Sequence, residues 1–188
     1  MISALKEVLA YISPFDDAEL DRIAALFHSL QCRRNEQILR EGETCTAFYF
    51  VQKGSIRTYF IDKKGNERTR YIMLDNWIGT ALTSFISQQP SLECIEAMED
   101  SELLFISHKD FFELNEQLSN WKRFYQRILE MAYAFQNKKI ESLVTLSAKE
   151  RYQQVLEENP ALIQRVSNKV LASYLDINPE TLSRLKSR

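Results

Sequence analysis

The sequence contains few of the residues that bind metals or form disulfides. Its 188 residues include 3 cysteines, Cys32, Cys45 and Cys94, and 2 histidines, His28 and His108. The cysteines are odd in number and far apart, with no C-x-x-C pair, which is typical of reduced cysteines in a cytoplasmic protein. An iron–sulfur site needs clustered cysteines, and a metal-dependent enzyme needs converging histidines and a carboxylate. We therefore expect no metal, no cofactor and no catalytic residues.

Glycine and long apolar segments are also scarce. The chain has 4 glycines, at positions 42, 54, 65 and 79, and all of them fall between short apolar runs. Glycine at such places predicts turns that need a positive φ or a close approach of the backbone. No apolar run approaches the roughly 20 residues that a membrane-spanning helix needs, so we expect no membrane contact.

The net charge of −2 does not by itself indicate a protein that binds nucleic acid. The distribution of charge is more informative. From residue 165 onward there are five basic and two acidic residues, which gives a local balance of +3. This balance supports DNA contact only weakly, because it is common on solvated helices. The charged residues are Arg165, Lys169, Arg184, Lys186 and Arg188, against Asp176 and Glu180.

The middle of the chain, from residue 37 to residue 107, has the two-residue period of β-strands. Short aromatic and β-branched segments alternate with turn residues, and Lys63-Lys64-Gly65-Asn66 has the composition of a hairpin tip. Many short antiparallel strands with regular turns predict a small sandwich or jelly roll. The five segments are Phe48–Val51, Ile56–Ile61, Arg68–Leu74, Cys94–Ala97 and Leu103–Ile106.

Helices are predicted on both sides of this β region. Asp16 and Glu19 have the spacing of a capping box. Apolar residues at helical spacing extend the helix that follows to Leu30, which places His28 on it. After the strands, a short helix is expected to start at Ser107, and Ser147 and Glu150 have the spacing of a capping box that opens a later helix.

The longest predicted helix covers residues 119–146 and carries a wide apolar stripe. This stripe is broader than a small jelly roll can cover, so we expect the helix to pair with a copy of itself in a homodimer. A helix that packs only on its own β domain is the alternative. The expected dimer interface consists of Trp121, Tyr125, Ile128, Ala132 and Phe135.

The segment from residue 166 to residue 188 has the pattern of a helix-turn-helix. Asp176 takes the place of the usual turn glycine and tolerates the left-handed conformation better than most residues. Asn178 is a natural N-cap, and Pro179 at the first helical position has a suitable φ. A generic helical hairpin is the alternative interpretation. The apolar residues expected between the helices are Leu171, Ala172, Leu175, Ile177, Leu182 and Leu185.

Several short motifs occur in a characteristic order along the chain. Glu41-Gly42-Glu43 precedes a predicted strand. The next motif along the chain is Tyr49-Phe50-Val51-x-x-Gly54-Ser55-Ile56-Arg57. Asn76-Trp77-Ile78-Gly79 comes next, and Asn178-Pro179-Glu180-Thr181-Leu182-Ser183-Arg184 lies near the end. Together with the long helix, this order resembles the catabolite-activator/FNR (Crp/Fnr) family of bacterial transcription regulators over essentially the entire chain.

The resemblance implies a homodimeric, sequence-specific regulator that reads a palindromic operator in double-stranded DNA, with RNA polymerase as a further partner. Glu180 and Arg184 match family positions that contact base edges, and Thr181 matches one that contacts phosphate. An arginine can bond guanine O6 and N7 together, and a glutamate accepts from cytosine N4. Pro179 stands where other members carry a third base contact. The expected DNA-binding residues are Lys169, Asn178, Glu180, Thr181, Ser183, Arg184 and Lys186.

The resemblance also implies an effector pocket, but without the residues for a cyclic nucleotide. Members that bind one have Gly-Glu followed by an arginine about a dozen residues later. Here Thr80 follows Gly79, and Ser91 stands near the arginine position. A buried phosphate needs a charge-assisted donor, and Glu93 and Glu96 would repel it. We expect a different effector or none. The candidate pocket residues are Gly79, Thr80, Ala81, Ser91, Leu92 and Ile128.

The predicted architecture is an α+β protein in three parts. Residues 1–118 form a cyclic-nucleotide-binding-like jelly roll with flanking helices, residues 119–146 a dimerisation helix, and residues 147–188 a helix-turn-helix domain that lacks a C-terminal β wing. Two other functions are weighed against DNA binding. One is a metal-dependent enzyme, which the two histidines disfavour. The other is a regulatory module whose degenerate helix-turn-helix contacts a protein, which the acidic charge and missing wing keep open.

Overall fold

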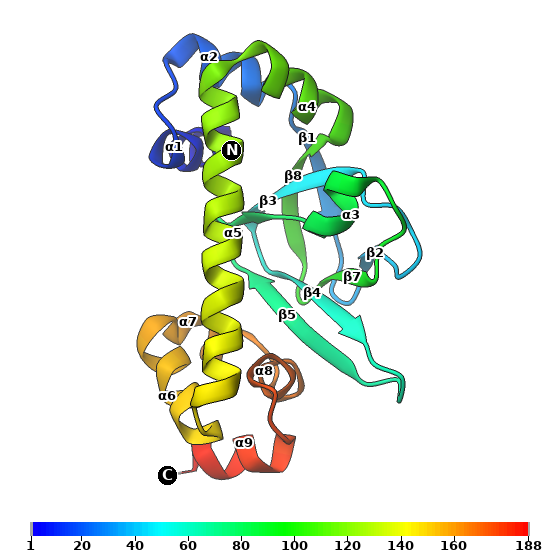
Figure 1. Ribbon diagram of the computed structural model, residues 1–188, viewed down its shortest axis with the longest axis vertical. Helices are drawn as coiled ribbons and strands as arrows, with labels where there is room; N and C mark the ends of the chain where they lie inside the picture. The colour runs from blue at the N-terminus through cyan, green and yellow to red at the C-terminus, as the bar shows by residue number, and fades with distance from the viewer. Residues whose placement is uncertain (1, 188) are drawn as a thin grey trace. The chain divides into compact units, whose positions relative to one another are not determined.

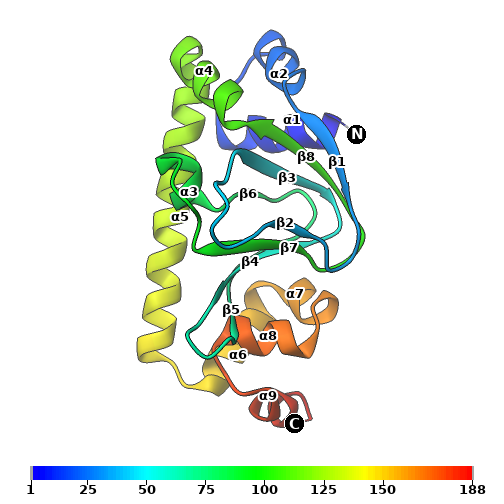
Figure 2. The ribbon, with the colours of Figure 1, turned by 90° about the vertical axis from the view of Figure 1, so that its right-hand side faces the viewer.

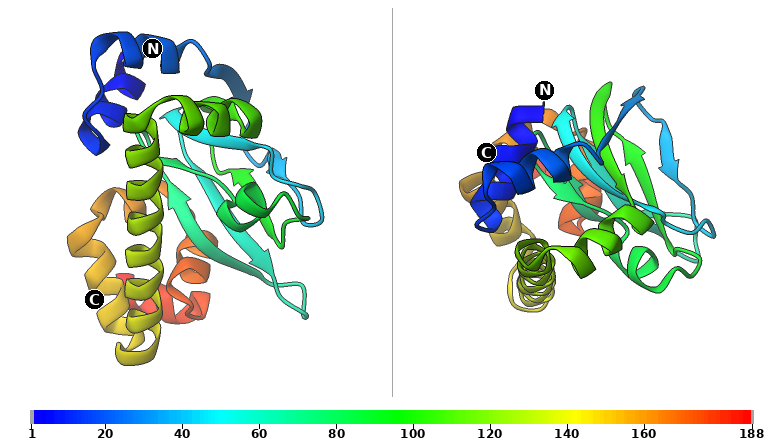
Figure 3. Two further views of the ribbon diagram at one scale, coloured as in Figure 1. Left: turned by 45° about the horizontal axis from the view of Figure 1, so that its top comes forward. Right: turned by 90° about the horizontal axis from the view of Figure 1, so that it is seen from above.

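The computed structural model describes residues 2–187, so Arg188 of the basic end lies outside the described residues. The chain forms two compact units, which are described separately. The first, called the β-roll unit, comprises Met1–Thr58 and Ile72–Glu130, and the second, called the C-terminal unit, comprises Tyr59–Tyr71 and Met131–Arg188. The longest helix, α5 (Ser119–Thr145), is continuous and contributes to both units (Figures 1 and 3).

Two four-stranded sheets make up the β-roll, in the orders β1-β8-β3-β6 and β2-β7-β4-β5 (Figure 2). The pairs β1–β8, β3–β8, β3–β6 and β2–β7 are antiparallel, which confirms the predicted jelly-roll class. Four of the five predicted strand segments lie within observed strands, and the fifth, Arg68–Leu74, extends one residue beyond β5, which ends at Met73. The strands are β1 (His28–Cys32), β2 (Gln37–Leu39), β3 (Ala47–Lys53), β4 (Ile56–Ile61), β5 (Glu67–Met73), β6 (Ile78–Gly79), β7 (Glu93–Ala97) and β8 (Ser101–Ser107).

The predicted capping signals begin the expected helices. Asp16 and Glu19 form a reciprocal capping box, as do Ser147 and Glu150, and the Ser107 side chain accepts a hydrogen bond from the Asp110 amide. These contacts satisfy backbone amides that have no partner within a helix. The other helices are α1 (Ile2–Ile12), α2 (Asp17–Ala24), α3 (Leu82–Ser87), α4 (His108–Gln117), α6 (Ala148–Glu158), α7 (Pro160–Arg165), α8 (Asn168–Leu175) and α9 (Pro179–Lys186).

The prediction that the second helix continues to Leu30 is wrong. Helix α2 ends at Ala24, and the chain then enters strand β1 at His28. Ser29 and Leu30 pair with Leu104 and Leu103 of β8. Phe27 and Leu30 happen to continue the helical spacing, but a backbone partner far along the chain outweighs this local pattern.

An aromatic cluster anchors the start of α5 to the β-roll unit. Trp121 and Phe111 are fully buried, and their rings meet edge-on with centroids 5.1 Å apart. The Trp121 indole nitrogen donates a 2.9 Å hydrogen bond to the Phe111 carbonyl. Phe48 and Phe85 complete the cluster, each with its ring centroid 5.3 Å from that of Phe111. Large buried rings with satisfied polar atoms are strong packing anchors, so this end of α5 is fixed within its own chain.

No helix among residues 2–187 is both long and apolar enough to cross a membrane.

The turn between β3 and β4 depends on a close backbone approach at Gly54. Its φ is +101°, and an added Cβ would lie 2.3 Å from Ser101 Oγ and 2.8 Å from Ser101 Cα. The amide of Gly54 donates to Asp75 Oδ1, and the amide of Ser55 donates to Ser101 Oγ. The turn therefore has no room for a side chain.

We predict that Gly54→Ala lowers the free energy of unfolding by about 2–4 kcal/mol, because strain at positive φ adds to the clash with Ser101. Gly42→Ala is the matched control, since Gly42 also has a positive φ but nothing lies within 4 Å of its Cβ position. We expect the control to lose about 1 kcal/mol. Urea unfolding curves of both variants measure the difference, and equal losses would contradict the prediction.

Candidate nucleic-acid interface and effector pocket

Helices α8 and α9 form the predicted helix-turn-helix. Ser167 caps α8 by accepting a hydrogen bond from the Val170 amide, and Asp176 ends the helix in the left-handed conformation at φ +52°. The Ile177 amide then donates to the Ala172 carbonyl over 3.0 Å, which closes the turn. An aspartate tolerates this conformation, so the sequence prediction for Asp176 is confirmed.

The start of α9 and the packing between the two helices also follow the sequence pattern. The Asn178 side chain accepts from the Glu180 amide over 2.8 Å, and Pro179 occupies the first turn. Four of the predicted apolar residues are almost completely buried, while Ile177 and Leu185 are half-buried. The buried residues are Leu171, Ala172, Leu175 and Leu182.

The expected DNA-binding side chains lie mainly on the exposed face of these helices. Arg184 reaches Thr181 Oγ1 at 3.5 Å, and Lys186 donates to Asn168 Oδ1 at 2.6 Å. The side-chain oxygen of Asn178, Oδ1, accepts the capping hydrogen bond from the Glu180 amide, so this atom has a structural role. Thr181 is half-buried. The exposed members are Lys169, Asn178, Glu180, Ser183, Arg184 and Lys186.

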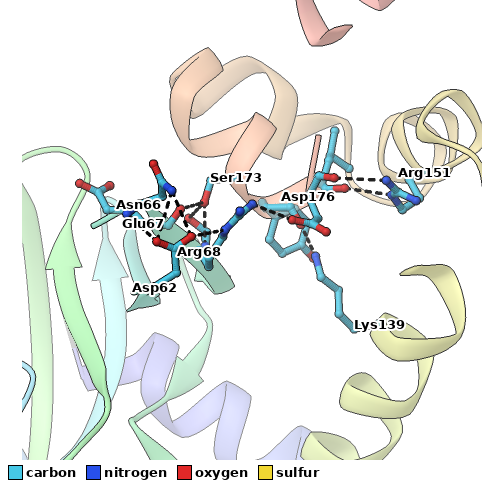
Figure 4. Close-up of polar contacts among 11 residues, drawn as sticks. Asp62, Asn66, Glu67, Arg68, Lys139, Arg151, Ser173 and Asp176 are labelled. Atoms are coloured by element: carbon cyan, nitrogen blue, oxygen red, sulfur yellow. Dashed lines mark hydrogen bonds and ion pairs between the residues drawn. The ribbon is translucent and has the colours of Figure 1, made fainter. Parts of the chain in front are cut away.

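Two cations from outside the helix-turn-helix bind the C-terminal carbonyl groups of α8 (Figure 4). Arg151 of α6 donates to the carbonyls of Leu175, at 2.9 Å, and Asp176, at 3.3 Å. Lys139 of α5 donates to the Tyr174 carbonyl and lies 3.7 Å from the Tyr174 ring centroid. Positive charge at a helix C-terminus is favourable, because the carbonyl dipoles point there. We call these two residues the carbonyl clamp.

Burial in the carbonyl clamp alters the proton affinity of Lys139. Desolvation is the largest effect and lowers the pKa of Lys139 to about 8, and nearby Arg151 lowers it too. The carboxylate of Asp176 acts in the opposite direction and raises this pKa. Neither clamp residue is recognisable from the sequence, because their partners lie 24 and 35 positions away and no motif connects them.

The hairpin of β4 and β5 also contacts α8 within the C-terminal unit (Figure 4). Glu67 Oε1 lies 3.1 Å from the Lys169 ammonium nitrogen, and Arg68 Nη1 lies 2.9 Å from Asp176 Oδ1. The Ser173 hydroxyl bonds to the hairpin backbone at two points. Lys169, an expected phosphate contact, therefore already has an anionic partner.

Two hydroxyl groups of the candidate effector pocket make hydrogen bonds within the chain. Thr80 donates to the Ala47 carbonyl at 2.7 Å and lies 3.0 Å from Cys45 Sγ. Ser91 donates to the Glu93 carbonyl and accepts from the Glu93 amide. Ser91 thus closes a local turn with Glu93.

The remaining candidate pocket residues differ in exposure. Ala81 is fully buried before α3, Gly79 is half-buried at the end of β6, and Ile128 is buried on α5. Leu92 is 72% exposed, so its side chain is largely surrounded by solvent. The structure therefore does not gather the six candidates into one set of inward-facing groups.

The two glutamates near this region are both largely enclosed. Glu93 is buried, and Glu96 forms an ion pair with the buried Arg57 guanidinium at 3.3 Å. Gln37 Nε2 donates to the same Glu96 carboxylate at 2.8 Å. A buried carboxylate requires such partners, and this pairing of Arg57 and Glu96 gave no recognisable signal in the sequence.

The stripe expected to form a dimer interface is largely used within the chain. Trp121 and Ile128 are buried, whereas Tyr125, Ala132 and Phe135 are half-buried. The Phe135 ring packs edge-on against Tyr71, with centroids 4.9 Å apart. The helix nevertheless exposes other large apolar side chains. These are Met131, Tyr133, Ile140, Leu143 and Val144.

Among the described residues, no group of three or more histidine, cysteine, aspartate or glutamate side chains is placed to hold a metal ion.

We predict that an NMR titration of the Lys139 side chain gives a midpoint of about 8. Because folding lowers this pKa from 10.5, the unfolded chain binds more protons between these values, so the contribution of Lys139 to stability rises with pH across that interval. Asp176→Asn should lower the midpoint further, because it removes the carboxylate that favours the charged amine. A midpoint near the ordinary value of 10.5, or an upward shift in Asp176→Asn, would contradict this.

Comparison with known proteins finds one family match, within the first two thirds of the chain. Residues 29–117 match the family model of the cyclic nucleotide-binding domain. No curated protein matches the chain in sequence.

Solved structures extend the likeness beyond that domain. FixK2 from Bradyrhizobium japonicum is similar with a TM-score of 0.73 and 18% identity, covering 86% of this chain and 83% of that one. CLP, a c-di-GMP-responsive global regulator from Xanthomonas campestris, has a TM-score of 0.72 and 20% identity, with coverage of 92% and 90%. A transcriptional regulator of the crp/fnr family from Eubacterium rectale has a TM-score of 0.71 and 20% identity, with coverage of 93% and 85%.

Residues 29–117 are thus similar to the cyclic nucleotide-binding domain, and the chain shares the fold of the Crp/Fnr transcription regulators over most of its length.

Proposed function

We propose that the protein is a homodimeric, sequence-specific DNA-binding transcription regulator. The observation that carries the proposal is the exposed polar face of α9, which is held by a capped turn and a buried apolar contact with α8. A recognition helix must present polar side chains at a fixed angle in order to read base edges in the major groove.

Two side chains on this face have the chemistry for reading bases. The Arg184 guanidinium can bond guanine O6 and N7 together, and the Glu180 carboxylate can accept from cytosine N4. Lys169, Lys186 and Ser183 are suited to phosphate oxygens, which set the register without specifying the sequence.

The proposed dimer seam runs along an exposed face of α5 that lies beside the stripe expected from the sequence. Positions 129, 133, 136, 140 and 143 repeat with spacings of four and three, so they share one face of the helix. Tyr133 is 71% exposed and Ile140 is 58% exposed. A second copy of α5 in the same register would cover both, whereas Trp121 and Ile128 are already buried within the chain.

We also propose that the effector is not a cyclic nucleotide. Binding the cyclic phosphate requires a charge-assisted donor, usually an arginine. Ser91 stands near that position and its hydroxyl closes a turn with Glu93. The Thr80 hydroxyl is likewise engaged, with Ala47 and Cys45.

Selection from a randomised duplex pool tests the DNA-binding proposal. We predict that the purified protein enriches a palindrome with half-sites about one helical turn apart. Arg184→Ala should relax the preference at one position in each half-site, at a cost of about 1–3 kcal/mol in discrimination. Lys149→Ala, which removes an exposed cation at the start of α6, is the control and should keep the same site preference. An unchanged site in Arg184→Ala would overturn the assignment, and a lack of enrichment even with cell extract would favour a protein-binding module.

Sedimentation of Ile140→Glu tests the proposed seam. We predict a monomer, because the substitution places a charge at the centre of the seam, and operator binding should weaken by roughly tenfold or more as the two half-sites lose their linkage. Ala134→Glu is the matched control, because Ala134 is also exposed on α5 but lies about 120° around the helix from position 140. A dimeric Ile140→Glu, or a monomeric Ala134→Glu, would rule out this face.

A further inference from the structure

The β4–β5 hairpin, Tyr59–Tyr71, is part of the same compact unit as the helix-turn-helix. Its strand β5 lies at the edge of its sheet. The backbone of an edge strand has one side available for hydrogen bonds to other groups. In this protein a side chain of α8 uses that side.

Ser173 of α8 makes this connection with a single hydroxyl group (Figure 4). Its Oγ accepts a 2.7 Å hydrogen bond from the Thr69 amide and donates a 2.8 Å bond to the Glu67 carbonyl. The Thr69 hydroxyl oxygen lies 3.1 Å away as well. The hydroxyl thus bridges two residues along β5, as a neighbouring strand would.

Two ion pairs flank the Ser173 hydroxyl. Glu67 pairs with Lys169 on one side, at 3.1 Å, and Arg68 pairs with Asp176 on the other, at 2.9 Å. These four residues and Ser173 are called the hairpin latch.

The hairpin that carries the latch has its own internal support at Asp62. The Asp62 carboxylate accepts from the amides of Lys64 and Asn66 and pairs with Arg68 at 3.3 Å. Hydrogen bonds from Asn66, together with those from Lys64 and Arg68, lower the pKa of Asp62 to about 2. This carboxylate is therefore charged at neutral pH and helps to hold Arg68 towards Asp176.

We propose that the hairpin latch is an autoinhibitory contact that competes with DNA. Lys169 is suited to a phosphate oxygen, but its ammonium group is paired with the Glu67 carboxylate. A DNA phosphate must displace this internal anion before it can bind Lys169. The Ser173 bonds hold Glu67 in place, so the competitor is present at a high effective concentration. This inference rests on the proposed DNA-binding function and adds that an internal contact weakens the affinity for DNA.

The charges in the latch also indicate what kind of partner can displace Glu67 from Lys169. The competing groups are carboxylate and phosphate at one ammonium, so a polyanion of high charge density such as duplex DNA outcompetes a single glutamate. Glu67 is 27% exposed at its side chain and Lys169 is 73% exposed, so phosphate can approach the lysine from solvent.

Glu67→Gln tests the inference, because it removes the charge while keeping the size of the side chain. Affinity for a mixed-sequence duplex is measured by fluorescence anisotropy at fixed low salt. We expect Glu67→Gln to bind about two- to fivefold more tightly than the wild type, which corresponds to the loss of one exposed ion pair. Glu157→Gln is the matched control, since it removes the same charge from an exposed position of α6 in the same unit, and it should change affinity much less.

A second pair of variants separates the latch from a general charge effect. In a Lys169→Ala background, Glu67→Gln should no longer raise affinity, because the competition takes place at that lysine. Ser173→Ala should raise affinity in the wild-type background, and hydrogen exchange at the Thr69 amide should accelerate because its acceptor is lost.

The outcomes distinguish this inference from the proposed function. If wild type, Glu67→Gln and Glu157→Gln bind DNA equally well, the latch is not a competitor and the inference fails while the DNA-binding proposal stands. A gain that persists in the Lys169→Ala background also overturns it. If none of the variants binds DNA, the proposed function fails and the competition fails with it, whether or not the Thr69 amide is protected.

Discussion

The orientation of α9 depends on how the C-terminus of α8 is stabilised. Asp176 leaves α8 in a left-handed conformation, and the carbonyls of Tyr174, Leu175 and Asp176 point away from the helix with no helical partners. Lys139 and Arg151 donate to them from two other helices. The turn is thereby fixed by α5 and α6 as well as by its own apolar contacts. Movement of the last turns of α5 would therefore shift Lys139 and disturb the turn that precedes α9.

Helix α5 has to satisfy two demands with one apolar surface. Its first turns are used by the β-roll unit, where Trp121 and Phe124 are buried, and Phe135 packs on Tyr71 in the C-terminal unit. What remains for a second copy is a neighbouring face with Tyr133 and Ile140. The apolar surface of α5 is therefore divided: one face packs within the chain, and the neighbouring face is left for the proposed partner.

The β-roll unit is similar to a cyclic nucleotide-binding domain, but several of its polar groups make hydrogen bonds or ion pairs within the chain. The hydroxyls of Thr80 and Ser91 bond to the chain, and the buried Arg57 pairs with Glu96. A charged or hydroxylated ligand would have to displace bonds of this kind, and unmade buried bonds are costly. The bonds made by Thr80 and Ser91 therefore support the proposal that the effector is not a cyclic nucleotide.

The sequence by itself determined the features that depend on neighbours a few residues apart. The caps at Ser147 and Asn178, the left-handed Asp176 and the helix-turn-helix core follow local rules of backbone geometry and hydrogen bonding. Tertiary structure alone decided where α2 gives way to β1, which face of α5 stays exposed and which cations bind the end of α8. Lys139 and Tyr174 are 35 positions apart, and Lys169 and Glu67 are 102 apart. Contacts at such separations depend on how whole elements pack, and no local pattern encodes them.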